Sequence, residues 1–395
     1  MKKNYQWKVS VIIGMLFVAV QCTPRPLGYT TTPTLAEREL AMEASTPSPM
    51  PTVFVIPTSI LDGQLPDDLV FVDTDLDDWK SYTVTHNSDL KQQTFNSIVI
   101  APDENIWIGG SNGVALFNGS DWTSFFIPSE LLSTESNYHI TSISVDNSNS
   151  VWTAGRGSSV YRFKEKSWTK ELDQKSVSAM EANPQDGILW FTFDYWGGAM
   201  KYDGGNWLAY TDEDGLLSNQ VLDVTFDAKG TTWFVTDDGI SSFDGKTWNN
   251  YPLELFCSSP SCYTDGLFAN IAIGPDETLW FTLRSAGLFH YSTSEQWERY
   301  YTDLIFQDSF PVSSMCFTPD GKLWMGKWSQ HSVTLFYFQD GQWHIPRIKN
   351  MDGTYTIPFG RINDIACASD NSIWFVSASN AGILHYTPGI VHNLD

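Results

Sequence analysis

Two tryptophans, Trp196 and Trp328, have the side chains and surroundings best suited to binding a ligand. Both stand among residues that can form hydrogen bonds: Asp194, Tyr195, Lys327 and His331. An aromatic ring with polar neighbours suits stacking on a sugar ring or anchoring a protein interface, because it combines apolar area with hydrogen bonding. Alternatively, the two rings only cover loop backbone. These residue types indicate binding of a glycan or a protein, and we expect no cofactor.

A run of alternating acids near the N-terminus is the one candidate for a metal site. It consists of Asp73, Asp75, Asp77 and Asp78. The run lacks the glycine and the terminal glutamate of an EF-hand loop. We therefore expect a solvated start of a strand and no metal.

The charge balance excludes some partners. The 395 residues include 46 acids and 23 Lys or Arg, which gives a formal net charge of −23. Such a chain repels phosphate backbones and anionic membrane surfaces, so we expect no nucleic acid partner. The hydrophobic content of 42% is high enough for a folded core.

The N-terminal residues have the pattern of an export signal. Lys2, Lys3 and Lys8 are followed by the apolar stretch Val9–Val20, which is shorter than the roughly 20 residues of a membrane span. Cys22 follows in a setting that resembles a bacterial lipoprotein signal, although Gln21 replaces the usual small residue. Lipidation of Cys22, ordinary cleavage and an uncleaved anchor all remain open. We predict a signal peptide over 1–21 and a Thr/Pro-rich linker over 22–66.

Tryptophan recurs about every 44 residues in two series. The first is Trp107, Trp152, Trp190, Trp233, Trp280, Trp324 and Trp374, and the second is Trp79, Trp122, Trp168, Trp207, Trp248, Trp297 and Trp343. Turns rich in Asp, Gly, Asn and Pro, with alternating apolar residues between them, predict four short strands in each repeat. Repeats of this length with four strands are typical of β-propeller blades. We predict an all-β propeller over 67–395, with these tryptophans packed between blades.

The tryptophan series also predicts how the ring closes. The seventh repeat has Trp374 but lacks a second tryptophan, and the missing piece stands at Asp78–Tyr82. This segment has the same W-x-x-Y form as Trp207–Tyr210. We therefore expect seven blades, with the N-terminal strand completing the C-terminal blade and leaving no open edge.

The four cysteines of the repeat region fall into two pairs. Cys257 and Cys262 lie in one loop, and in an exported chain we expect them to form a small-loop disulfide. Cys316 and Cys367 fall on the first strands of blades six and seven, offset by one residue when their following turns are aligned. Because an offset of one turns a side chain to the other face of a strand, we expect two buried free thiols.

The stretch Tyr210–Tyr251 resembles the two-component regulator propeller repeat. It has the D-G-L-x-S-N-x-V start, the D-x-x-G-x-x-W turn and the G-I-x-x-F-D strand. The resemblance extends more loosely over 67–390 and implies the extracytoplasmic sensing part of a hybrid histidine kinase, often one that recognises polysaccharide fragments. Only Pro388–Asp395 follows the last repeat, so we expect a binding head without a kinase of its own.

Ligands of propellers usually bind at the loops between the second and third strands and at the loops that link blades. Trp196 and Trp328 fall in such loops, and Arg156 and Arg284 hold comparable positions in blades two and five. We expect a monomeric, exported, non-catalytic head that binds a glycan or a cell-envelope protein and touches the membrane only through its N-terminus. The alternative is a lyase of the streptogramin B lyase type, for which His331 and His139 would be the candidate histidines.

Overall fold

The structure, a computed structural model, describes residues 54–55, 68–83, 89–91, 94–132, 138–155, 158–193, 197–256, 269–283, 287–292, 296–301, 303–306, 311–329, 333–350, 354–357, 360–377 and 382–389. All of them belong to the second of two compact units, Met50–Asp395.

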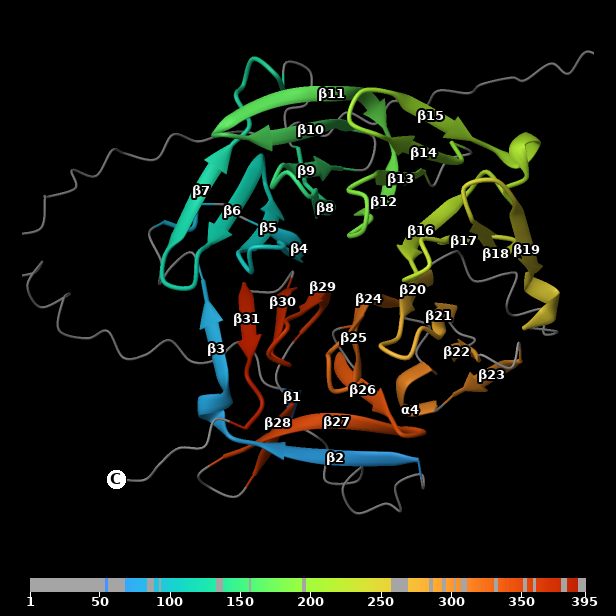
Figure 1. The fold of residues 1–395 in the computed structure, drawn as a ribbon. Helices are drawn as coiled ribbons and strands as arrows, with labels where there is room; N and C mark the ends of the chain where they lie inside the picture. The colour runs from blue at the N-terminus through green and yellow to red at the C-terminus, as the bar shows by residue number, and fades with distance from the viewer. Residues whose placement is uncertain are drawn as a thin grey trace, which may run out of the picture. The chain divides into compact units, whose positions relative to one another are not determined.

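Seven antiparallel blades are arranged in a ring (Figure 1). Blade one is β4 (Phe95–Ile100), β5 (Ile106–Gly110), β6 (Gly113–Phe117) and β7 (Trp122–Phe126). Blade two is β8 (Ser142–Val145), β9 (Val151–Ala154), β10 (Ser158–Lys164) and β11 (Ser167–Lys175). Blade three is β12 (Val177–Ala182), β13 (Leu189–Phe193), β14 (Ala199–Tyr202) and β15 (Trp207–Tyr210). Blade four is β16 (Val221–Phe226), β17 (Thr232–Thr236), β18 (Gly239–Phe243) and β19 (Trp248–Pro252).

The remaining blades contain the C-terminal half of the ring and the N-terminal strands. Blade five is β20 (Ala269–Ile273), β21 (Leu279–Leu283), β22 (Gly287–Tyr291) and β23 (Trp297–Tyr300). Blade six is β24 (Val312–Phe317), β25 (Leu323–Lys327), β26 (Leu335–Gln339) and β27 (Gln342–Lys349), extended by β28 (Tyr355–Ile357), β1 (Phe54–Val55) and β2 (Leu69–Thr74). Blade seven is β29 (Ile362–Cys367), β30 (Ile373–Ser377), β31 (Ile383–Tyr386) and β3 (Trp79–Tyr82). The predicted seven-bladed propeller is confirmed.

The helices of the described residues are short segments at the edges of the blades. They are η1 (Leu76–Asp78), η2 (Asp212–Asp214), η3 (Leu253–Leu255) and α4 (Asp303–Phe306). None of the helices in this part of the chain has the length and hydropathy that a membrane span requires.

An aspartate fixes the turn between the first two strands of several blades. In blade four, Asp227 accepts the Thr231 N–H on one oxygen at 2.9 Å and the Trp233 indole N–H on the other at 3.0 Å. Asp146 holds Trp152 in the same way in blade two, at 2.9 Å. The D-x-x-G-x-x-W pattern thus links a turn to the tryptophan of the next strand, because one carboxylate satisfies backbone and side-chain donors together.

The tryptophans of both series pack between neighbouring blades, as the repeat pattern predicts. Trp374 of blade seven lies 5.3 Å from Phe117 and 6.5 Å from Trp122 of blade one, centroid to centroid. Trp190 of blade three meets Phe234 of blade four at 5.1 Å. Each blade therefore buries its apolar face against the next one, which is where most of the stabilising burial of the ring occurs.

The N-terminal strand closes the ring, as predicted. β3 pairs antiparallel with β31, and Trp79 stands opposite Tyr386. The Trp79 ring lies 4.3 Å from that of Tyr386, and its indole N–H donates to the Thr74 hydroxyl at 3.0 Å. Blade seven consequently depends on residues from both ends of the propeller.

The N-terminal segment also adds strands to blade six that the sequence did not predict. β2 pairs in parallel with β27, and Arg347 bonds to Asp73 at 2.6 Å across this pair. Asp73 is exposed, as the sequence pattern predicted, and it is also ion-paired. β1 pairs with β28, so Phe54–Val55 of the stretch predicted as linker is part of a sheet.

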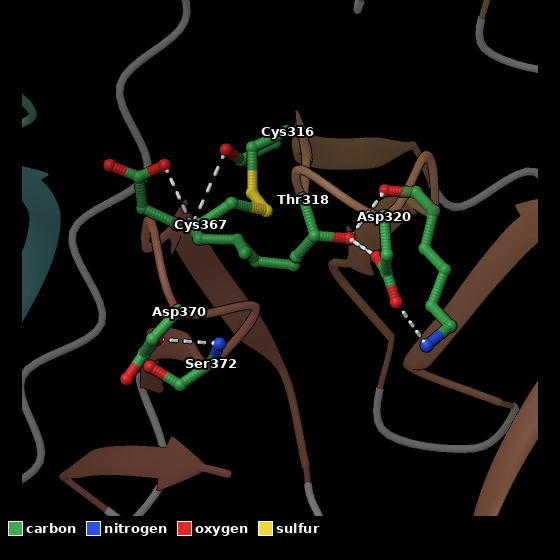
Figure 2. Close-up of a disulfide and its surroundings, with 10 residues drawn as sticks. Cys316, Thr318, Asp320, Cys367, Asp370 and Ser372 are labelled. Atoms are coloured by element: carbon green, nitrogen blue, oxygen red, sulfur yellow. Dashed lines mark hydrogen bonds and ion pairs between the residues drawn. A yellow bond between two sulfur atoms is a disulfide. The ribbon is translucent and has the colours of Figure 1, made fainter. Parts of the chain in front are cut away.

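Cys316 and Cys367 form a disulfide, so the prediction of two free thiols was wrong (Figure 2). Their Cα atoms are 5.8 Å apart, on the innermost strands of blades six and seven. The one-residue offset does place them on opposite faces of their strands. Because the two blades stack face to face, however, opposite faces of neighbouring blades point towards each other, and the sulfurs meet.

Candidate functional site

Seven innermost strands surround the centre of the ring (Figure 1), namely β4, β8, β12, β16, β20, β24 and β29. Their residues line a central channel. We call the end where these strands begin the linking-loop face; it includes Pro311 before β24, Arg361 before β29 and Trp328 after β25. We call the end where they finish, at the turns before the second strands, the turn face. Of the ligand-binding residues predicted from the sequence, Trp328 lies at the linking-loop face.

Trp328 is the most exposed tryptophan of the described residues, with 39% of its surface accessible. Its backbone N–H donates to the Pro311 carbonyl at 3.1 Å, which ties the loop after β25 to the start of β24. The Arg361 guanidinium lies over the indole ring. The structure therefore brings a cation and an accessible aromatic ring together at the mouth of the channel, from blades seven and six respectively.

Arg361 is a binding candidate that the sequence analysis missed. Its Nε is buried and has no hydrogen-bond partner. Burial also lowers the pKa of the guanidinium below its usual value. Two other arginines of the described chain are ion-paired instead, Arg162 with Glu171 at 2.8 Å and Arg347 with Asp73. The one sequence signal for Arg361 is its position immediately before the innermost strand β29.

Lys327, predicted as a ligand contact, is fully buried next to Trp328. Its ammonium group donates a hydrogen bond to the Ile305 carbonyl of α4. This bond gives the buried ammonium group an acceptor and joins α4 to the end of β25. Lys327 thus supports the loop that carries Trp328 and does not present its charge at the surface.

The other predicted positions lie outside the described residues. They are Asp194, Tyr195, Trp196, Arg156, Arg284 and His331 of the ligand site, Cys22 of the lipidation site, and the pair Cys257 and Cys262. Of the predicted ligand site, the structure therefore locates Trp328 and Lys327.

The channel contains three carboxyl groups with raised pKa values in a cavity of about 610 Å³. Burial raises the pKa of Glu181 to about 8, of Asp223 to about 7 and of Asp364 to about 6. The negative charge of Asp223 contributes to the shift of Glu181, and that of Asp364 to the shift of Asp223. No lysine, arginine or histidine is among the described residues that line this cavity.

Two of these carboxyl groups join neighbouring blades. Asp223 of blade four accepts the Ile271 N–H of blade five at 3.0 Å, and Asp364 of blade seven accepts the Ile98 N–H of blade one at 2.9 Å. A buried backbone donor that would otherwise lack a partner is satisfied in each case. The two aspartates therefore serve the integrity of the ring, and the described residues contain no group of three or more ligands placed to hold a metal ion.

The turn face is a surface of interlocked turns around a cavity of about 490 Å³. The Gln185 side-chain amide donates to the Ala228 carbonyl at 2.6 Å, and the Ala228 N–H donates to Glu277 at 2.9 Å. Ser369 of blade seven bonds to Glu104 of blade one at 2.6 Å. These polar groups bond to one another and so join neighbouring turns.

No protein-family model matches this sequence, and no curated protein matches it either. Several solved structures do match the fold. The extracellular domain of a hybrid two-component system from B. thetaiotaomicron superposes with a TM-score of 0.59 at 16% identity, over 78% of this chain and 39% of that one. The chain shares the propeller fold of that domain. It spans well under two thirds of the length of these sensor domains.

Two further structures match over nearly their whole length. Virginiamycin B lyase from Staphylococcus aureus has a TM-score of 0.58 at 13% identity, with 78% of this chain and 98% of that chain covered. YCF48 bound to the D1 peptide has a TM-score of 0.57 at 15% identity, with 81% and 98% covered. The repeats predicted a fold like that of sensor propellers and of the lyase type. These structural matches confirm that similarity of fold.

Proposed function

We propose that this chain is an exported, non-catalytic β-propeller that binds a glycan on its linking-loop face and serves as the sensing head of a signalling system. Its fold matches the extracellular domains of two-component systems. The N-terminal residues have the form of an export signal, and Cys22 is the residue that a lipid anchor would modify.

The observation that carries this proposal is the exposed indole of Trp328. An indole with 39% of its surface open to solvent leaves a large apolar area in water, which is the surface that the C–H groups of a sugar ring cover. The backbone of Trp328 is held by its hydrogen bond to the Pro311 carbonyl, and the preceding residue, Lys327, is held by its bond to the Ile305 carbonyl. A rigid, preformed platform binds with little loss of conformational entropy.

A glycan-array screen of the full chain tests the proposal. The wild type should bind at least one glycan class, and the Trp196→Ala/Trp328→Ala double variant should lose that signal. The matched control is Trp168→Ala, which removes a tryptophan packed against Phe163 within blade two, 4.9 Å away, and should leave the signal in place if the fold persists. Binding that survives in the double variant, or no binding by the wild type, would refute the proposal.

The match to a complete lyase supports a second candidate function, a propeller lyase. The one described histidine of the pair expected for it, His139, is exposed and lies 3.5 Å from the Thr94 hydroxyl through Nδ1. Turnover of a streptogramin B that requires a divalent metal and is lost in His331→Ala would establish this function. Absence of turnover in the metal-loaded wild type would exclude it.

A further inference from the structure

Arg361 carries a positive charge for which the described residues provide no counter-ion. No carboxylate of the described residues bonds to it, and its Nε is buried without an acceptor. Its terminal nitrogens donate no hydrogen bond to the described residues and are not among the buried atoms that lack a partner. The guanidinium thus lies over Trp328, and its terminal N–H groups have no acceptor among the described residues.

An arrangement of this kind is energetically unusual in this chain. Acids outnumber Lys and Arg by 46 to 23, so a carboxylate partner for any one arginine would be easy to supply. Partly burying a guanidinium without a partner costs free energy, because lost hydration is not replaced by hydrogen bonds. The cost is recovered when an anion binds, which makes Arg361 a preorganised anion receptor.

We propose that Trp328 and Arg361 together form a subsite for an acidic sugar, a uronic acid residue within a glycan. This inference rests on the glycan binding proposed above and specifies its chemical class. The uronate carboxylate accepts hydrogen bonds from the terminal nitrogens of Arg361, which present two parallel N–H donors to a planar anion. The C–H face of the same sugar ring covers the exposed part of the Trp328 indole.

The guanidinium covers part of the indole, so a sugar that contacts the accessible part of Trp328 lies next to this cation. A carboxylate attached directly to a sugar ring reaches a cation beside that ring without a linker. A neutral sugar would cover the indole but leave the guanidinium without an anion. The subsite should therefore bind the uronic acid more tightly than its methyl ester. This difference in affinity should arise from Arg361.

Isothermal titration of the full chain with oligomers of galacturonate, glucuronate and mannuronate tests this inference. Each oligomer is paired with its methyl ester, which has the same ring without the charge. At an ionic strength of about 0.1 M, which screens the repulsion between an oligouronate and the net charge of −23, the wild type should bind at least one oligouronate about tenfold or more tightly than the matching ester, as expected for a charge-assisted hydrogen-bond pair. Arg361→Gln should lose this preference, and Arg361→Lys should retain part of it because the charge remains while the planar fork is lost.

The matched control is Arg299→Gln, which removes the same charge from an arginine on the outer strand of blade five, 5.1 Å from the Tyr301 ring. This variant should bind like the wild type, and circular dichroism should show that all variants are folded. If acid and ester bind equally, or if Arg361→Gln keeps the preference, the inference is refuted while the glycan-binding proposal stands. If no oligouronate binds but the array finds a neutral glycan, the inference alone is wrong; if neither binds, both are wrong.

Discussion

Replacement of Trp79 by alanine should destabilise the whole propeller, because this one residue joins the two ends of the ring. Trp79 is only 8% exposed and packs against Tyr386 at 4.3 Å and Phe375 at 6.2 Å. Removing a buried tryptophan costs about 3–5 kcal/mol, which includes the cavity left behind. The hydrogen bond from the indole to Thr74 adds about 1 kcal/mol. A total of about 4–6 kcal/mol is a large part of the stability of an ordinary domain.

The measurement is equilibrium unfolding in urea, with circular dichroism and tryptophan fluorescence followed together. Trp328→Ala is the matched control, since it is the same substitution at an exposed site and should cost less than about 1 kcal/mol. Coincident transitions in both signals would show that the ring unfolds as one unit. A Trp79→Ala protein no less stable than Trp328→Ala would refute the closure of blade seven by the N-terminal strand.

Three further predictions concern the stability of the ring. Replacing Cys316 and Cys367 by serine should lower the unfolding free energy by about 4 kcal/mol, the chain-entropy value for their separation of 51 residues, and an unchanged urea midpoint would contradict this. Burial raises the pKa of Asp364 from 3.8 to about 6. The protonated carboxyl group therefore contributes its full share to the free energy of unfolding below about pH 4, and this contribution is lost as the pH rises through 6. Asp364→Asn should therefore gain stability relative to the wild type between pH 4 and pH 8, and a constant difference across this range would disprove the shift. Asp227→Ala should cost about 2–3 kcal/mol because the Trp233 indole and the turn lose their acceptor, and a thermal melt within error of the wild type would speak against that role.

The blades and their closure could be predicted because they depend on local, repeated signals. The tryptophan spacing identifies each second strand, and Trp79 in its W-x-x-Y form identifies the missing strand of blade seven. The parallel pairing of β2 with β27 could not be predicted in this way. It depends on contacts across more than 270 positions, such as the bond between Asp73 and Arg347, and β2 carries no repeat signal of its own.

The wrong and missed predictions for the cysteines, Lys327 and Arg361 also arise from contacts between segments that are distant in the sequence. Strand alternation correctly placed Cys316 and Cys367 on opposite faces, but alternation within one sheet does not say which faces of two sheets meet. The position of Lys327 next to a loop predicts a surface residue, whereas its bond to α4 holds it in the interior. Arg361 was overlooked because its importance comes from lying over Trp328, a contact between two blades.

Hydrogen–deuterium exchange of the full chain, with and without oligogalacturonate, oligoglucuronate and oligomannuronate, tests the central claim most directly. The account predicts slower exchange in the peptides that contain Trp328 and Arg361 on the linking-loop face. It predicts no change at the turn face, in the peptides that contain Pro184, Pro275 and Pro319. Protection confined to the turn face, or no protection by any of these oligomers, would contradict the assignment of an acidic-glycan site to the linking-loop face.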